Sequence, residues 1–193
     1  MYTGERSYKD AIADIFTCHS CGLSQLRTNI VVYRGNPRSD VMVIGEGPGE
    51  KEDLQGKPMV GPTGSYLVEI LDRNGLTLKD IYITNTILCR EPQNADPSQD
   101  HIRACYPNIM KQIQLVNPKY ILAVGKHAAQ LLIPNAKPIT QIAGMSFTPP
   151  HLGGIVVIPI PHPSYIMRAR SLTEQYERLV AKICEQIKSK EAF

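Results

Sequence analysis

The chain has 193 residues, of which 42% are hydrophobic and 20% are charged, and its formal net charge is +3. This composition excludes a disordered or fibrous chain, and the length favours one domain over residues 1–193. The charge is too small to prove nucleic-acid binding, although it permits it. No apolar run reaches the ~18 residues of a membrane span, and the polar N-terminus lacks a secretory signal, so we expect a cytoplasmic protein without a membrane partner.

Apolar patterns of strand length alternate with helical patterns along the chain. In chain order they predict a helix (6–16), a strand (41–44), a helix (65–74), a strand (81–84), a helix (98–117), a strand (120–124), a helix (126–132), a strand (155–158) and a helix (172–187). Each strand is continuously apolar, which is typical of strands buried on both faces. The sequence therefore predicts a three-layer α/β/α fold around a central, mainly parallel, four-stranded sheet. The Pro- and Gly-rich residues 133–154 are expected to form a long loop.

Four of the five cysteines indicate a metal or cluster site, because a disulfide framework is not expected without a secretory signal. Cys18 and Cys21 form a CxxC pair, Cys89 follows the second predicted strand, and Cys105 lies 16 residues later on a predicted helix. Four thiolates suit a structural zinc ion or a [4Fe-4S] cluster, and the residue types leave both open. The alternative is that Cys89 and Cys105 are buried as small apolar side chains.

Two further residues near this pattern are expected to have other roles. Cys184 lies on the apolar stripe of the last predicted helix, so we expect it to fill the core. His19 lies inside the CxxC pair, where it is more simply placed facing solvent than as a ligand.

The stretch 45–64, GEGPGEKEDLQGKPMVGPTG, follows the first strand and contains six glycines. Glycine lets the backbone approach a ligand closely, and the N–H groups before a helix can bind an anion or a carbonyl oxygen. The stretch matches neither the dinucleotide fingerprint nor the P-loop. Glu46, Glu50, Glu52 and Asp53 are either solvated loop charges or functional groups, and Glu46 is favoured as functional because it immediately follows the strand.

Polar residues also follow the second and fourth strands, where ligand sites of parallel sheets lie. The Asn85 amide offers a donor and an acceptor that suit the edge of a nucleobase, although an asparagine can also cap a turn. His162 is placed to act as an acid or a hydrogen-bond donor, or it has a structural role. Arg168 and Arg170 are placed to contact phosphates, unless they form a solvated face.

Taken together, these motifs resemble the uracil-DNA glycosylase superfamily, and in particular its family 4, whose members carry a [4Fe-4S] cluster. The resemblance covers nearly the whole chain, from Cys18 to the final helix. Its motifs are GEGPGEKED (45–53), GKPMVG (56–61), TN (84–85), CR (89–90), Asn94-x-Asp96-Pro97 and HPSYIMR (162–168). The resemblance implies a monofunctional DNA glycosylase of base excision repair. Such an enzyme flips uracil out of DNA and hydrolyses its N-glycosidic bond, leaving an abasic site.

The resemblance also implies roles for single residues. The family's cluster ligands fall on Cys18, Cys21, Cys89 and Cys105, which selects the [4Fe-4S] cluster over zinc.

In the implied active site, His162 matches the histidine that donates to uracil O2, and Asn85 matches the residue that reads uracil O4 and N3. The backbone of Gly47, Pro48 and Gly49 is expected to line the pocket. Gly47 stands where other families of the superfamily place a water-activating aspartate, so the hypothesis for this chain is that Glu46 helps to order the water.

DNA, single- or double-stranded, is the implied partner of a monomeric protein. Pro163, Ser164 and Arg168 would belong to the loop that presses into the flipped-out site and clamps phosphates. One departure concerns Met59, which stands where the family has a phenylalanine that stacks on the base. A methionine is a more flexible platform than an aromatic ring. The alternative is therefore a glycosylase-fold protein that binds DNA or a partner, with weak, absent or altered base specificity.

Overall fold

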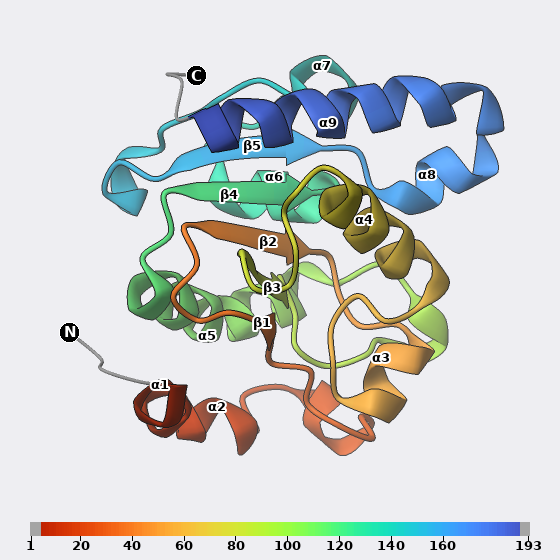
Figure 1. Cartoon of the computed structure of the whole chain (residues 1–193). Helices are drawn as coiled ribbons and strands as arrows, with labels where there is room; N and C mark the ends of the chain where they lie inside the picture. Colours follow the sequence, from red (N-terminus) through yellow and green to blue (C-terminus); the bar gives the residue numbers. More distant parts are fainter. Residues whose placement is uncertain (1–4, 190–193) are drawn as a thin grey trace.

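A five-stranded sheet forms the middle of the protein, with helices on both sides (Figure 1). The structure is a computed structural model and describes residues 5–189, without the side chains of residues 5–7, 168 and 170. The strands are β1 (Arg34–Gly35), β2 (Val41–Gly45), β3 (Ile81–Asn85), β4 (Tyr120–Val124) and β5 (Val156–Ile160), in the order β1-β3-β2-β4-β5. Strands β2 to β5 are parallel, and the edge strand β1 is antiparallel to β3.

The helices pack on the two faces of this sheet. They are α1 (Glu5–Ala11), α2 (Ala13–Phe16), α3 (Glu50–Gln55), α4 (Pro62–Arg73), α5 (Gln99–Val116), α6 (Lys126–Leu132), α7 (Ile139–Ile142), α8 (Pro163–Arg168) and α9 (Thr173–Ser189). Short 3₁₀ turns lie at Gly22–Gln25, Pro92–Asn94, Pro150–Leu152 and Arg170–Leu172. Among the described residues, no helix is both long and apolar enough to cross a membrane.

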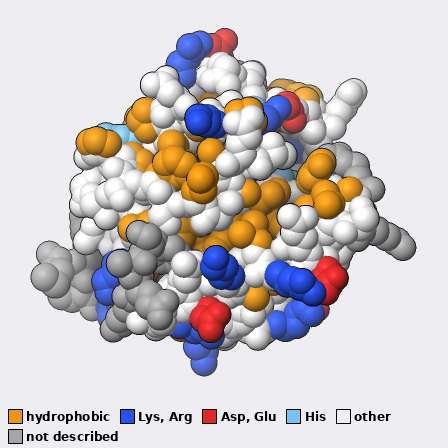
Figure 2. Space-filling view, turned by 90° about the horizontal axis from the view of Figure 1, so that it is seen from above, with side chains coloured by type: hydrophobic (Ala, Val, Ile, Leu, Met, Phe, Trp, Pro, Cys, Tyr) orange, Lys and Arg blue, Asp and Glu red, His pale blue; other side chains and the backbone are white. Residues whose placement is uncertain are grey.

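Alternate residues of each strand face alternate layers of helices. Met42 and Ile44 of β2 pack with α1, α2, α5 and α6, whereas Val41 and Val43 pack with α4 and α9. This follows from the two-residue period of a strand, and it explains why the central strands are apolar throughout. Seen from the side of α7 and α9, apolar side chains also gather on the surface between charged ones (Figure 2).

A buried chain of hydroxyl groups holds the N-terminal helices on the sheet. The Tyr8 hydroxyl of α1 lies 2.6 Å from the Tyr82 hydroxyl of β3, which donates to Gln112 Oε1 of α5 at 2.6 Å. Burial raises the pKa of both tyrosines, so the hydroxyls stay protonated and keep these bonds. The same contacts fix the direction in which the chain continues toward Cys18.

The predicted strands are confirmed, and the sheet gains one strand that the sequence pattern did not reveal. Strand β1 has two residues, too few to show a period. The predicted helix 6–16 is two helices, α1 and α2, and no proline or glycine marks the break. Helix α4 starts at Pro62, before the predicted residue 65, because proline is tolerated in the first turn of a helix.

Three stretches predicted as loops contain short helices. These are α3 within 45–64, α7 within 133–154, and α8 in the stretch after β5. Cys184 is buried in the core, as predicted, and burial raises the pKa of its thiol to about 11. His19 is exposed, also as predicted.

Candidate functional site

A cleft of about 830 Å³ lies at the carboxyl ends of the parallel strands. Each of the four strands contributes to it: Gly45 ends β2, Asn85 ends β3, Gly125 follows β4, and His162 follows β5. This is the position expected for a ligand site in a parallel sheet. The cleft also brings together other residues that the sequence singled out, namely Glu46, Gly47, Pro48, Gly49, Met59, Pro163 and Ser164.

The side chain of Asn85 lies across the end of the neighbouring strand. A Cβ atom on Gly45 would stand 2.4 Å from Asn85 Oδ1, so this position of β2 admits no side chain. Asn85 is only 4% exposed, and it borders the cleft. Its amide is not among the described side-chain groups that are both fully buried and without a partner. The arrangement leaves its donor and its acceptor available to a ligand.

His162 has a defined proton arrangement. Its Nδ1 atom accepts the backbone N–H of Ser164 at 3.3 Å and lies 2.8 Å from Ser164 Oγ, at the start of α8. A backbone amide can only donate, so Nδ1 is the acceptor, and the neutral ring carries its proton on Nε2. In its neutral form the imidazole therefore donates from Nε2.

Glu46 is half-buried, and its backbone is fixed by β3 and the residues after it. Its carbonyl oxygen accepts the Thr86 hydroxyl at 2.5 Å and the Ile87 N–H at 3.3 Å. Its carboxylate lies against Gly125, where a Cβ would stand 2.4 Å from Oε1 and where φ is +88°. A glycine after β4 therefore gives the carboxylate the room it occupies.

A cation and a carboxylate face each other at the rim of the cleft. Lys126 Nζ bonds Asp96 Oδ2 at 2.6 Å, and this bond is the main reason why the pKa of Lys126 is raised. The charge of Glu46 raises it further. Lys126 therefore remains charged beside two acids.

Met59 has an unusual backbone in the wall of the cleft. Its φ is +53°, in the left-handed region, which costs a non-glycine residue roughly 1–2 kcal/mol. Arg34 Nη1 donates to its carbonyl oxygen at 3.2 Å, and its side chain is 7% exposed among the residues of α4. These contacts thus hold Met59 in a backbone conformation that is energetically unfavourable.

Glu52 braces two segments of the cleft wall, although the sequence left it open whether it is solvated. It is 9% exposed, and its Oε1 accepts the Gly61 N–H at 2.8 Å. A Cβ on Gly49 or on Gly61 would stand 3.0 Å from its carboxylate. Both segments therefore need glycine to approach Glu52.

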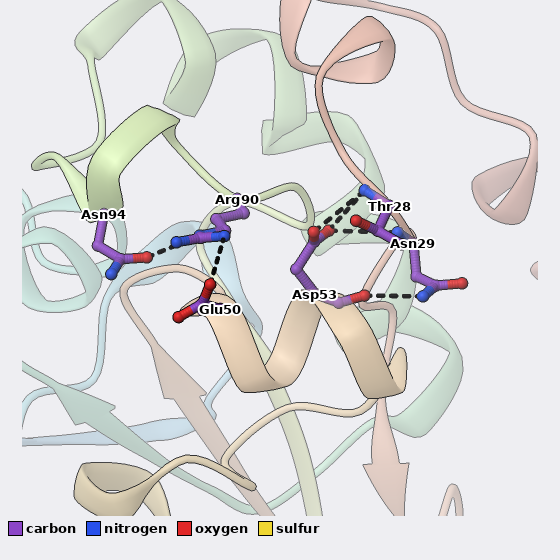
Figure 3. A network of polar contacts seen from close by, with 6 residues as sticks. All are labelled: Thr28, Asn29, Glu50, Asp53, Arg90 and Asn94. Atoms are coloured by element: carbon purple, nitrogen blue, oxygen red, sulfur yellow. Dashed lines mark hydrogen bonds and ion pairs between the residues drawn. The ribbon is translucent and has the colours of Figure 1, made fainter.

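Helix α3 also connects to the segment that follows the CxxC pair (Figure 3). Asp53 accepts the N–H groups of Thr28 and Asn29 at 3.0 and 3.2 Å, and Asn29 Nδ2 donates to the Asp53 carbonyl oxygen at 2.7 Å. On the other side of the helix, Glu50 lies 3.9 Å from Arg90, which follows Cys89. Figure 3 shows α3 between these two contacts. Asp53 is thus a structural residue, not a solvated charge.

We expect Glu52→Ala to lower the free energy of unfolding by about 1–3 kcal/mol, because the buried Gly61 N–H loses its acceptor. The matched control is Glu50→Ala, two residues earlier on an exposed face of the same helix, where a loss below about 1 kcal/mol is expected. Urea unfolding of both variants measures the difference. Equal losses would show that Glu52 does not brace the wall.

The four cysteines that the sequence singled out share one neighbourhood outside the cleft. Cys18 and Cys21 are half-buried, and Cys89 and Cys105 are buried. Burial, together with the charges of the other three thiols, raises the pKa of Cys105 to about 12. Within residues 5–189, no three His, Cys, Asp or Glu side chains converge closely enough to hold a single metal ion.

Two side chains that sequence reasoning missed donate hydrogen bonds to these sulfurs. Arg27 Nη1 donates to Cys89 Sγ at 3.1 Å, and its Nη2 donates to the Cys18 carbonyl oxygen at 2.8 Å. Asn108 Nδ2 donates to Cys18 Sγ at 3.4 Å. Burial alone would raise the pKa of Cys18, but its hydrogen bonds with Ser20 and Asn108 and the Arg27 charge lower it overall. In the sequence, the sign that Arg27 could contact the cysteines was its position six residues after the CxxC pair.

Helix α8 carries the last group of predicted residues. Ser164 lines the cleft, and Tyr165 and Met167 are exposed apolar residues that the sequence reasoning did not single out. The backbone of Arg168 ends the helix, while the side chains of Arg168 and Arg170 lie outside the described part of the chain. Their predicted phosphate contacts stay predictions.

Comparison with known proteins places this site in context. The model of the Uracil DNA glycosylase superfamily matches residues 32–187. A protein of Thermotoga maritima named Type-4 uracil-DNA glycosylase is 38% identical over 190 residues, which cover 98% of this chain and 97% of that protein. Proteins of the same name from Archaeoglobus fulgidus and Sulfurisphaera tokodaii are 34% and 35% identical. Their matches cover 93% and 89% of this chain, and 92% and 81% of theirs.

Proposed function

The chain belongs to the uracil-DNA glycosylase superfamily, and we propose that it is a uracil-DNA glycosylase, a hydrolase of base excision repair. It flips uracil out of DNA and hydrolyses the N-glycosidic bond, leaving an abasic site. The observation that carries the proposal is the cleft at the strand ends. There the Asn85 side chain and the imidazole of His162, whose Nδ1 accepts the Ser164 N–H, line the same cavity.

Base recognition is assigned to Asn85. Uracil presents the O4 acceptor and the N3–H donor on one edge, which a carboxamide complements with its N–H and its carbonyl oxygen. Cytosine has an amino donor in place of O4 and an acceptor in place of N3–H. It would leave both groups of Asn85 unpaired only in the amide orientation that pairs uracil, so rejection of cytosine requires that this orientation is held when the base is bound. The backbone of Gly47, Pro48 and Gly49 forms the wall beside this edge.

Charge stabilisation is assigned to His162. As the N-glycosidic bond breaks, negative charge develops on the leaving uracil, including O2. A fixed N–H donor aimed at that oxygen stabilises the transition state more than the ground state. The hydrogen bond of Nδ1 to Ser164 supports this role, because it keeps the proton on Nε2 and orients the ring.

Water is positioned, in this proposal, by Glu46. Its half-buried carboxylate lies between the glycine loop and Gly125, on the cleft wall. The next residue is Gly47, so the chain has no aspartate there to act as a strong base.

We expect Glu46→Gln to lower the single-turnover rate of uracil excision by about tenfold, because an amide orders water less strongly than a carboxylate and cannot accept a proton. The matched control, Glu69→Gln on the exposed face of α4, is expected to keep the wild-type rate. Rapid mixing with excess enzyme and one uracil-containing oligonucleotide measures both. A full rate for Glu46→Gln would remove this residue from the mechanism.

A [4Fe-4S] cluster is the proposed cofactor, held by Cys18, Cys21, Cys89 and Cys105. Four free thiols in one neighbourhood match the donor set of such a cluster, and the N–H group of Arg27 beside Cys89 is typical of residues around ligating sulfurs. When bound, the cluster supplies a cross-link between the N-terminal segment and the start of α5. Four thiolates also suit a zinc ion, and the similarity to proteins named Type-4 uracil-DNA glycosylase is what favours the cluster.

The alternative is a glycosylase-fold protein that binds DNA or a partner with weak, absent or altered base specificity. Met59 favours it, because a flexible thioether stands in the cleft wall where the resemblance implies a stacking aromatic ring.

The test that separates the two functions uses a labelled oligonucleotide with one uracil, treated with the protein and then with alkali. The proposed function predicts a strand break at the uracil and none in an all-thymine control. No break at stoichiometric protein would favour the binding role, and a break only in a second oligonucleotide, at a deaminated purine that replaces the uracil, would show altered specificity.

DNA is the partner, single- or double-stranded, and Ser164 and Arg168 are proposed to contact its phosphates. A monomer is the proposed form of the protein. Action on DNA supports an intracellular protein, and the cytoplasm is the proposed location.

A further inference from the structure

A second pocket, of about 250 Å³, lies between α5 and α6. Gln99, Ile102 and Tyr106 line it from α5, at the i, i+3 and i+7 positions of one helix face. His127 and Leu131 line it from α6, four residues apart. None of these residues lines the main cleft.

His127 is the unexplained group of this pocket. It is 6% exposed, and neither ring nitrogen has a hydrogen-bond partner among the described residues. Asp96 Oδ2 is 3.7 Å from Nε2, too far for a hydrogen bond, and it already accepts one from Lys126. Both nitrogens lie below the accessible surface, so the pocket borders other atoms of this ring.

The walls of the pocket suit a flat ring. Ile102 and Leu131 are apolar, and Tyr106 adds an aromatic side chain that can stack on a planar ligand. The volume is below the range of about 300–1,000 Å³ that is typical of sites for drug-sized molecules. The pocket therefore fits a single small ring system.

The polar groups of the pocket suit the edge of such a ring. Gln99 and Gln130 each offer a donor and an acceptor. Arg103 is the cation of the lining, bound to Asp100 on the exposed side of α5, and the lining contains no acid. A heterocycle attached to an anionic backbone matches this combination.

We propose that the pocket between α5 and α6 binds one unpaired base of the DNA strand whose uracil occupies the main cleft; this rests on the proposed function. The two cavities are adjacent, because Asp96 and Lys126 line the main cleft while Asp96 lies 3.7 Å from His127. A strand that leaves the cleft over this pair reaches the pocket next. Base stacking on an aromatic residue supplies affinity without requiring a particular sequence.

The test measures binding, which does not depend on excision. Fluorescence anisotropy gives the Kd of the wild-type protein for single-stranded oligonucleotides with one uracil, in which each flanking nucleotide in turn is replaced by a sugar without a base. We expect one flanking position at which loss of the base weakens binding at least about fivefold, the lower end of what one stacked base contributes.

The variants are Tyr106→Ala, which removes the ring, and Tyr106→Phe, which keeps it. Tyr106→Ala is expected to bind the intact oligonucleotide at least fivefold more weakly and to become insensitive to the missing base. Tyr106→Phe and the exposed control Gln114→Ala on α5 are expected to behave as wild type.

Two results would overturn the proposal: no flanking position matters for the wild type, as expected for a pocket that holds only water, or Tyr106→Ala stays fully sensitive to the missing base. If the protein shows the expected base sensitivity but excises no uracil, the pocket is supported and the proposed function is contradicted.

Discussion

Replacing His162 with glutamine is expected to lower the single-turnover rate of uracil excision by about 10²–10³-fold, the usual cost of removing one donor from a developing oxyanion. The Nδ1 atom accepts the Ser164 N–H, so the neutral ring donates from Nε2. A glutamine amide reaches about as far as Nε2, but it is flexible, is not held by that bond, and does not keep its N–H in the same place. Binding of the oligonucleotide is expected to change little, because the interaction strengthens only as charge develops.

The measurement is a single-turnover time course with anisotropy on the same oligonucleotide. The control is His151→Gln, at an exposed histidine in a 3₁₀ turn, which is expected to keep the wild-type rate. A His162→Gln protein within threefold of the wild-type rate would exclude this histidine as the donor to the leaving group.

Replacing Cys105 with serine is expected to remove the cluster and to lower the free energy of unfolding by at least about 3 kcal/mol, roughly 6–12 °C in Tm for a chain of this length. The proposed cluster ties residues before α3 to the start of α5, and the unligated site leaves buried thiols that cannot ionise readily. Burial raises the pKa of Cys105 to about 12, so this thiol ionises only when a cation stabilises the thiolate.

Iron content, visible absorption and thermal unfolding are measured together on protein purified without air. Cys184→Ala is the matched control, because it deletes a buried sulfur from the core of α9 and leaves the four proposed ligands intact. It is expected to lose stability through its cavity while keeping full iron. Iron and colour at the wild-type level in Cys105→Ser would show that Cys105 is not a ligand.

Helix α3 links the two sites physically. Asp53 holds the backbone of Thr28 and Asn29, directly after Arg27, and Glu52 on the same helix holds Gly61 in the cleft wall. The cysteine neighbourhood and the cleft are thus joined by one short helix. This connection explains why acidic residues in a glycine-rich stretch are buried.

The sequence alone determined the layers of this protein and the ends of the sheet that carry its chemistry. Continuous apolar runs such as 41–44 can only be strands covered on both faces, and parallel strands place Asn85 and His162 at one edge. The four cysteines were also visible as a set. These inferences succeed because a strand and the residue at its end are encoded by residues that are neighbours in the sequence.

Only the tertiary structure decided which polar groups are buried and what they bond. In the sequence, Glu52 and Asp53 look like solvated charges. Their carboxylates accept the N–H groups of Gly61 and Thr28, which lie 9 and 25 residues away, so the neighbouring residues do not reveal these partners. The tautomer of His162 was likewise open, although Ser164 is close in sequence, because it depends on where the backbone of α8 turns. Hydrogen bonds between distant segments form only after the sheet has brought those segments together, so no local pattern can encode them.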